Sequence, residues 1–299
     1  MSRKEFVSLA LVYLARGAGN GLASAEGFFE SYRAHPPGCP HELIVIAKGW
    51  AGIEGRGSLE RMANEHAARI IDLPDDGYDW GAYMRLAPHL SHEWICFLNT
   101  HSRPLATGWL NLMLKHVQST GVGAVGATAS WGTMIPTWPS LKPRWEWRLL
   151  HYPLRLARNA FIFVMNVRHF PYFPNPHLRS NAFLVRRELF NEFVGIRGIP
   201  RNKRDAHLLE SGKIGFARFL INRGLTPLVV GLNGMSYEPE QWISSGTFRV
   251  PGQSNLLISD NQTMAYEKAN QNLKRRLEIS AWGQSFPFTC SKLGNETTL

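Results

Sequence analysis

Four groups of polar and charged residues each follow an apolar run that has the length of a strand. They are residues 16–21, 48–50, 74–79 and 99–103. Together they supply arginine and lysine cations, aspartate carboxylates, a histidine and several glycines, a set that can bind a polar, charged small molecule. In open α/β sheets ligands bind beyond the carboxyl ends of the strands, so these groups are the first candidates for a binding site. Ordinary turns also favour Gly, Asp and Asn and would look similar in part.

The apolar runs alternate with segments of helical period through the first half of the chain. Strands are predicted at 7–14, 42–47, 69–73, 94–98 and 122–127, and helices at 23–34, 58–68, 79–90 and 106–119. Ser58 and Asp79 are plausible N-caps of their helices. Strands separated by helices of this length indicate right-handed βαβ units and a mostly parallel sheet, so the fold class is α/β.

Residues 131–178 interrupt this alternation. The segment holds four tryptophans, seven prolines and much of the basic charge, so we interpret it as an insertion. The pattern resumes with strands at 182–186 and 227–231 and helices at 187–193 and 208–222, the second ended by Gly224. We expect one domain over residues 1–240, including the insertion, followed by a C-terminal helical extension and tail over 241–299, with a helix at 262–279.

Charge and cysteine content exclude some classes of protein. The chain of 299 residues has a net charge of +10, and residues 142–204, with 13 basic and 3 acidic side chains, account for the whole surplus. A protein that coats nucleic acid would spread its charge or gather it in a tail. The three cysteines form no CxxC pair, so we expect neither disulfides nor structural zinc, as in a reducing cytoplasm.

Two apolar segments bear on membranes. The run at 6–15 follows Arg3 and Lys4 like the core of a signal peptide, but Glu5 and the glycine-rich turn after it favour a buried strand. In the insertion, basic residues spaced four, three, four and three fall on one helical face: Arg144, Arg148, His151, Arg155 and Arg158. Such a helix can lie on an anionic membrane, or can pack its apolar face on its own domain.

Four motifs follow one another along the chain. They read Asp76-Gly-Tyr-Asp79-Trp-Gly-Ala-Tyr83, Cys96-Phe-Leu-Asn99-Thr100-His101-Ser-Arg103, His177-Leu-Arg179-Ser-Asn181-Ala-Phe183 and Glu210-Ser-Gly. In this order, over about residues 6–231, the sequence resembles the nucleotide-diphospho-sugar glycosyltransferases of GT-A fold. Among these it is most similar to family-2-like and rhamnan-synthesis-type polysaccharide enzymes. The resemblance implies a Rossmann-like, mostly parallel sheet flanked by helices, with residues 131–178 as a basic, aromatic helical insertion.

The resemblance implies a role for each matching residue. Donor binding would involve Arg16 at the nucleotide, Asp76 and Asp79 at the base and ribose, and Asn99, Thr100, His101 and Arg103 near the diphosphate. Contacts to the diphosphate, sugar or acceptor would come from His177, Arg179, Asn181, Lys203, Arg204 and Arg218. Asp79 could equally be only a helix cap, and Arg103 only a surface arginine. Trp131 and Trp242 could stack on a sugar, or simply fill the core.

The metal site of the family is altered in this sequence. Asn99-Thr100-His101 stands where these enzymes usually carry an Asp-x-Asp motif that binds Mg²⁺ or Mn²⁺. Neither carboxylate is present, so Asn99 and His101 are at most candidate ligands, and the resemblance leaves metal use open.

Glycosyl transfer needs a base for the acceptor hydroxyl. The family places a carboxylate pair at the start of the helix after the sheet resumes, where Glu210 matches best and Asp205 lies just before it. Glu210 could instead be only a residue that stabilises a helix N-terminus. A single displacement with this base would invert the anomeric configuration.

The resemblance and the insertion together predict a function. We expect a hexosyltransferase-type enzyme that moves a sugar from a nucleotide-diphosphate donor to a glycan or lipid-linked acceptor in surface polysaccharide synthesis. It would be cytoplasmic, with peripheral attachment to an anionic membrane surface. One alternative is a non-catalytic nucleotide-sugar or glycan-binding module, which the missing Asp-x-Asp allows. Binding to nucleic acid is disfavoured because no standard motif for it is found.

Overall fold

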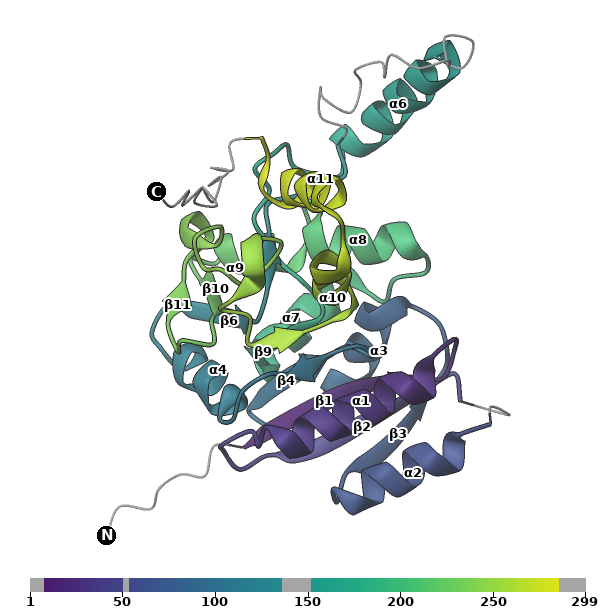
Figure 1. Cartoon of the computed structure of the whole chain (residues 1–299), viewed down its shortest axis with the longest axis vertical. Coiled ribbons are helices and arrows are strands. Elements are labelled where there is room, and N and C mark those ends of the chain that lie inside the picture. Colours follow the sequence, from purple (N-terminus) through teal and green to yellow (C-terminus); the bar gives the residue numbers. More distant parts are fainter. Residues whose placement is uncertain (1–7, 51–53, 136–151, 285–299) are drawn as a thin grey trace, which may run out of the picture.

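The computed structural model describes residues 8–50, 54–135 and 152–284 (Figure 1). Within them the main sheet has eight strands in the order β11-β10-β6-β9-β4-β1-β2-β3. Their bounds are β1 Leu9–Arg16, β2 Glu42–Lys48, β3 Arg69–Leu73, β4 Trp94–Leu98, β6 Val122–Gly126, β9 Ala182–Arg186, β10 Thr226–Val230 and β11 Ser236–Tyr237. β9 and β11 run antiparallel to their neighbours and the remaining pairs are parallel, which confirms the mostly parallel α/β sheet.

Helices cover both faces of the sheet, which is why its central strands are continuous apolar runs. Alternate residues of β1 contribute to two separate hydrophobic clusters, one on each face. On one face Phe28 of α1 (Gly21–Ala34), Leu59 of α2 (Arg56–Glu65) and Trp109 of α4 (Trp109–Val117) pack in the core. The predicted strand at 7–14 is thus confirmed, shifted by two residues to Leu9–Arg16.

The second face carries an aromatic core. α3 (Tyr78–Leu86), the 3-10 turn η1 (Ala87–His89), α7 (Arg187–Arg197), α8 (Lys203–Ser211) and α9 (Phe216–Ile221) supply it. Trp80 lies 5.9 Å from Phe216 and 6.3 Å from Phe190, measured between ring centroids. These contacts position α3, which carries the candidate carboxylate Asp79, against α7 and α9.

Both predicted serine and aspartate caps were wrong. α2 is preceded by Gly55 in the left-handed region (φ 100°) and Ser58 lies inside its first turn. α3 is preceded by Gly77 (φ 69°), and Asp79 is its second residue, with no capping hydrogen bond from its side chain. Glycine adopts positive φ without steric cost, so the backbone rather than a side chain begins these helices.

Two predicted single helices are pairs of helices. The segment 208–222 is divided into α8 and α9 by Gly212 and Gly215, where an added Cβ would lie 2.6 and 2.9 Å from backbone oxygens. Glu210 therefore lies in the last turn of a helix rather than near its start. The segment 262–279 is divided into α10 (Asn261–Lys268) and α11 (Gln271–Trp282), because Asn270 caps a second helix.

Short strands bring later parts of the chain to the sheet edge. β5 (Arg103–Pro104) pairs with β12 (Ile258–Ser259), and β7 (Ala129–Ser130) pairs with β8 (His177–Leu178). The turns η3 (Pro239–Gln241) and η4 (Pro251–Gln253) lead into β12. This route places the start of α10 beside the end of β4.

The insertion contributes one long helix, α6 (Tyr152–Val167), which extends away from the sheet layers (Figure 1). The structure describes only part of the predicted basic face, because Arg144, Arg148 and His151 lie outside the described residues. No helix in the described ranges has the length and apolar content needed to cross a membrane.

Candidate functional site

A cleft of about 290 Å³ lies at the carboxyl ends of β1 and β4. The chain continues from β1 to β2 and β3 on one side and to β4 on the other, so this is the topological switch point, where open α/β sheets bind ligands. The cleft brings together eight residues expected at a binding site: Arg16, Asp79, Asn99, Thr100, His101, Arg179, Asn181 and Glu210. The other lining residues are Ala18, Gly21, Ser180, Asn261 and Gln262.

One side of the cleft, the Arg16 wall, consists of Arg16 and Asp79, which line the cleft, and Asp75, which pairs with Arg16. Arg16 and Lys48 are register partners at the ends of β1 and β2. Arg16 donates from Nε and Nη2 to the two oxygens of Asp75, at 2.9 and 3.0 Å. This hydrogen bonding raises the pKa of Arg16 and lowers the pKa of Asp75.

Lys48 is a buried cation behind this wall. Its Nζ donates to the carbonyl of Tyr78 at 2.7 Å and lies 3.9 Å from Asp75. Burial lowers the pKa of Lys48, although Asp79 and Asp75 act in the opposite direction. The amine therefore places positive charge close to the carboxylates of the cleft.

Asp79 is partly buried, and its carboxylate accepts no hydrogen bond from any residue that the structure describes. Burial raises the pKa of Asp79 to about 6, with Lys48 opposing the shift and Glu210 adding to it. This carboxyl group thus changes its charge close to neutral pH.

The strand-end turn at 99–102 is closed by its own side chains. The Oδ1 of Asn99 accepts hydrogen bonds from the backbone N–H of His101 at 3.1 Å and from the hydroxyl of Ser102 at 2.9 Å. The Nδ1 of His101 lies 3.1 Å from the hydroxyl of Ser24, and burial lowers the pKa of this imidazole. The backbone N–H of His101 thus engages one lone pair of the Asn99 oxygen, and the single hydrogen of the Ser102 hydroxyl is shared between this oxygen and, at 2.7 Å, the carbonyl of Asn181.

These residues do not fit a Mg²⁺ or Mn²⁺ site. Hard cations need several free oxygen ligands, and the Asn99 oxygen is used by the turn. Across 8–50, 54–135 and 152–284, no three His, Cys, Asp or Glu side chains are grouped so that they could hold a metal ion. We derive no catalytic step through a metal.

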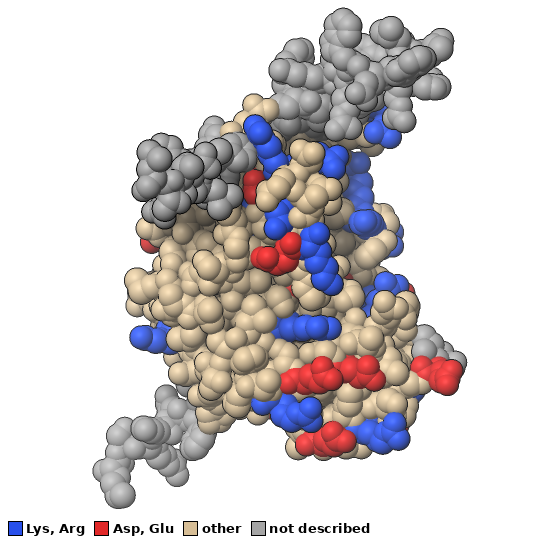
Figure 2. All heavy atoms as spheres, viewed as in Figure 1, with Lys and Arg blue, Asp and Glu red and all other residues tan. Residues whose placement is uncertain are grey.

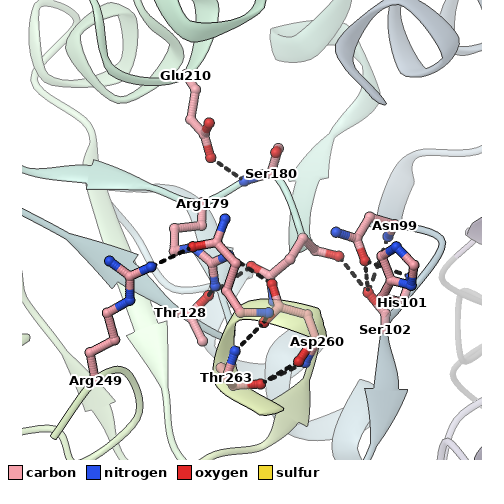
Figure 3. Close-up of polar contacts among 12 residues, drawn as sticks. Asn99, His101, Ser102, Thr128, Arg179, Ser180, Glu210, Arg249, Asp260 and Thr263 are labelled. Atoms are coloured by element: carbon pink, nitrogen blue, oxygen red, sulfur yellow. Dashed lines mark hydrogen bonds and ion pairs between the residues drawn. The ribbon is translucent and has the colours of Figure 1, made fainter. Parts of the chain in front are cut away.

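A second side of the cleft, the Arg179 wall, consists of Arg179 and Asn181, which line the cleft, and Thr128 and Asp260, which hydrogen-bond to them. Figure 3 shows Arg179 with Thr128 and Asp260. Arg179 donates to Asp260 at 2.7 Å and to the Thr128 hydroxyl at 3.2 Å, and its guanidinium lies 4.2 Å from the ring centroid of Phe248. Burial alone would raise the pKa of Asp260, but Arg179 and Thr263 hold that pKa below its usual range. The pair is a fixed, desolvated part of the site.

Asn181 directly precedes β9. Its Oδ1 accepts a hydrogen bond from the Thr128 hydroxyl at 2.7 Å, while its Nδ2 is buried and has no hydrogen-bond partner among the described residues. Buried donors are normally paired, so this unpaired NH₂ group in the cleft lining is a candidate to donate to a ligand.

Glu210 faces the cleft from the last turn of α8. Its Oε1 accepts a hydrogen bond from the backbone N–H of Ser180 at 2.9 Å (Figure 3). A helix C-terminus disfavours negative charge, so the interpretation of Glu210 as a stabiliser of a helix N-terminus is wrong. His177 is buried nearby with its Nδ1 2.8 Å from the carbonyl of Asn175; burial lowers its pKa, against the effect of the Glu210 charge.

Several predicted residues lie away from the cleft lining. Asp76 is paired with Arg85 at 2.7 Å on the surface. Asp205 accepts from the backbone N–H of Arg201 at the first turn of α8, the end opposite Glu210. Arg103 packs against α1, since a Cβ added at Gly27 would lie 2.3 Å from its guanidinium.

The other three predicted cations are also outside the lining. Arg204 donates to the carbonyl of Met165 at the end of α6, and Lys203 begins α8 beside it. Arg218 belongs to α9. Of the tryptophans, Trp242 is 1% exposed and fills the core, and Trp131 packs at 5.7 Å against Trp282.

Sequence reasoning missed the contribution of the C-terminal segment. Asp260 caps α10 by accepting from the backbone N–H groups of Gln262 and Thr263, and Thr263 bonds back to Asp260 N. This Asp-x-x-Thr capping box was a usable signal for a helix start at 261. No local sequence pattern predicted that Asp260 would pair with Arg179.

The sequence matches no protein-family profile and no curated protein. Solved structures of similar fold include a mannosyltransferase from Pyrobaculum calidifontis with GDP-Man and Mn²⁺, at 15% identity, 64% of this chain, 47% of that chain and a TM-score of 0.37. Another is glucosyl-3-phosphoglycerate synthase from Mycobacterium tuberculosis with Mn²⁺, UDP and glucosyl-3-phosphoglycerate, at 16% identity over 61% of this chain and 57% of that chain, with a TM-score of 0.34. A third is 4-diphosphocytidyl-2C-methyl-D-erythritol synthase from Anaerococcus prevotii, at 13% identity over 76% of this chain and 89% of that chain, with a TM-score of 0.44.

The chain spans about half the length of the first two proteins. At these identities and scores, none of the three assigns a role to a residue of this chain.

Proposed function

We propose that this chain is a GT-A-type glycosyltransferase that uses a nucleotide-diphosphate sugar. The observation that supports this most directly is the content of the switch-point cleft. There the end of β1, the turn after β4 and the start of α3 lie opposite a single glutamate, Glu210, which is held by a backbone N–H. A donor in the crevice would thus have a carboxylate facing its sugar end.

The chemistry assigned to Glu210 is that of a general base. Its Oε1 is oriented by Ser180, which leaves Oε2 to accept the proton of an acceptor hydroxyl as that oxygen attacks the anomeric carbon. The electron pair of the anomeric C–O bond leaves with the nucleotide diphosphate. A single displacement of this kind inverts the anomeric configuration. Arg16 and Asp79, at the other end of the cleft, would bind the nucleotide.

The test measures sugar transfer and donor hydrolysis with a panel of UDP-, GDP-, dTDP- and ADP-sugars, followed by NMR. Glu210→Gln should lower kcat about 10²- to 10⁴-fold while the Kd for the nucleotide stays within about twofold. Glu188→Gln, at an exposed position of α7, is the matched control and should have full activity. Full activity of Glu210→Gln, or a product with retained configuration, would refute the assigned role.

A non-catalytic nucleotide-sugar or glycan-binding module is the second candidate. The engagement of the Asn99 oxygen in its own turn favours it, because the usual cation ligand is then lacking. Nucleotide binding without transfer or hydrolysis for any donor and acceptor tried would support this candidate over the enzyme.

We also propose that the acceptor is a glycan or lipid-linked sugar of a surface polysaccharide pathway, presented at an anionic membrane surface. In support, α6 carries Phe161 and Val164 with 66% and 63% of their surface exposed, close to the exposed Arg158. On the face in Figure 2, basic side chains gather over α8 and α11, toward α6, while acidic ones lie along α1.

Co-sedimentation with vesicles tests the membrane proposal. Binding to vesicles with anionic lipid should be lost in the double substitution Phe161→Ser and Val164→Ser, and kept in Met235→Ser, which changes an apolar residue of equal exposure elsewhere. Equal binding by all three proteins, or none by the unaltered chain, would contradict membrane attachment.

A further inference from the structure

A nucleotide diphosphate brings two negatively charged phosphates into the cleft, and a glycosyltransferase must stabilise the charge that develops on them as the sugar leaves. The residues at the end of β4 do not fit a divalent cation, as described above. The inference below rests on the proposed function and concerns what takes the place of the cation.

Two arginines, Arg179 and Arg249, lie close to the carboxylate of Asp260. Both contact the ring of Phe248, at 4.2 and 4.9 Å from its centroid, and Asp260 is ion-paired with Arg179 at 2.7 Å. Arg249 donates to the neutral amide of Gln262 at 2.9 Å. Burial and the charge of Arg179 lower the pKa of Arg249 to about 10, which still leaves it protonated at neutral pH. Arg249 is not part of the cleft lining, but its charge adds to the positive potential around Arg179.

The orientation of the Asn181 amide is determined by its neighbours. Arg179 donates to the Thr128 hydroxyl, and this hydroxyl donates its own hydrogen to Asn181 Oδ1. Asn181 therefore presents its unpaired NH₂ group, on a side chain that is 1% exposed, as part of the cleft lining.

We propose that the cleft binds the diphosphate of its donor without a divalent cation, with the Arg179 guanidinium and the Asn181 NH₂ group supplying the positive charge and hydrogen bonds. The two groups come from one short segment before β9, and both line the cleft beside the turn after β4. Asp260 and Thr128 orient Arg179, so no reorganisation is needed when the ligand arrives.

Calorimetric titration of the unaltered chain with UDP, GDP, dTDP and ADP, each in EDTA and in Mn²⁺, tests the proposal. The preferred nucleotide should bind in EDTA with a Kd within about threefold of that in Mn²⁺, and far more tightly than its nucleoside. Binding that requires Mn²⁺ would overturn the metal-free site but leave the proposed function standing. Equal binding of nucleotide and nucleoside would also overturn the proposed diphosphate site. Failure of all four nucleotides in both buffers would remove the proposed function itself.

A substitution at Asn181 tests the hydrogen bond separately. Asn181→Asp retains the acceptor for Thr128 but replaces the NH₂ group by a negatively charged oxygen. The Kd in EDTA should rise at least about 10- to 100-fold, because a charge-assisted hydrogen bond is lost and a repulsion is added. Asn222→Asp adds the same charge at the exposed end of α9 and should bind normally. An unchanged Kd in folded Asn181→Asp, with folding checked by circular dichroism, would overturn the proposal.

Discussion

The two walls of the cleft each contain an arginine hydrogen-bonded to an aspartate, but the pairs differ in exposure. In the Arg16 wall the side chains of Arg16 and Asp75 are 48% and 33% exposed, while in the Arg179 wall those of Arg179 and Asp260 are 8% and 0% exposed. An exposed ion pair contributes about 0–1 kcal/mol to stability. Breaking a buried pair costs about 3–5 kcal/mol, because it leaves one charge desolvated and unpaired.

This difference separates two tasks within one site. Arg16 can exchange Asp75 for a ligand at little cost, since water already solvates both groups. Arg179 cannot move without stranding Asp260, so its position is set before any ligand arrives. One wall can therefore adapt to a ligand, and the other is a preorganised surface for it.

The largest effect should come from removing the buried carboxylate. Asp260→Asn keeps a capping oxygen for α10 but leaves the Arg179 charge uncompensated, and should lower the free energy of unfolding by about 3–5 kcal/mol. Urea denaturation at pH 7 measures this. A loss below about 1 kcal/mol would show that the buried pair is no more important to the fold than the exposed one.

A smaller contrast is expected when each arginine is changed to lysine. Lysine has one nitrogen in place of the two that contact Asp260 and Thr128, and it has no planar group to stack on Phe248, so Arg179→Lys should cost about 1–3 kcal/mol. Arg16→Lys should stay within about 0.5 kcal/mol. Thermal or urea unfolding of the two variants in parallel checks the comparison, and equal losses would contradict it.

In the Arg16 wall, the titration of Asp79 should make the stability of the protein depend on pH. Because the folded-state pKa of Asp79 is raised to about 6 from an ordinary 3.8, the folded state binds the proton more tightly than the unfolded state. This group's contribution to stability is therefore highest below about pH 4 and is lost as the pH rises through about 6. Asp79→Asn should stabilise the protein by about 2–3 kcal/mol at pH 7 and by much less at pH 4, since one pKa unit corresponds to about 1.4 kcal/mol. Urea unfolding at both pH values measures this, and a gain independent of pH would refute it.

The smallest effect is expected at the exposed pair. Asp75→Asn should change the free energy of unfolding by less than about 1 kcal/mol, and added salt should reduce even that difference, because exposed charges are screened. Unfolding in low and high salt provides the measurement. A loss as large as that of Asp260→Asn would show that the two walls do not differ in the way their exposure indicates.

Much of the framework was predictable from local patterns. The strands at 69–73, 94–98 and 182–186 were placed without error because each is an apolar run bounded by polar residues or turns. The helix boundaries were less predictable, since positive-φ glycines rather than polar caps begin α2 and α3. The helix predicted at 208–222 ran through Gly212 and Gly215, so Glu210 was expected near the start of a helix, whereas it lies in the last turn of α8.

The composition of the cleft was predictable only in part. The strand-end position of Arg16, Asp79 and Asn99 was enough to expect them together, because parallel strands end at one edge of a sheet. Lys48 and Asp75 were within the same groups of residues, but nothing local showed that they pair around Arg16. The cations expected at 103, 203, 204 and 218 have the right charge, yet the helices and strands that carry them point them elsewhere.

The sequence by itself determined the α/β elements, their order along the chain and the edge of the sheet where polar groups collect, because these depend on apolar period and on the handedness of βαβ units. It also placed the positive surplus in residues 142–204. Only the tertiary structure decided that Arg179, one member of that surplus, is a buried cation paired with Asp260, 81 residues away. This pair forms only because β12 and α10 lie against the sheet edge. Contacts between residues so far apart in the chain produce no repeating pattern from which they could be predicted.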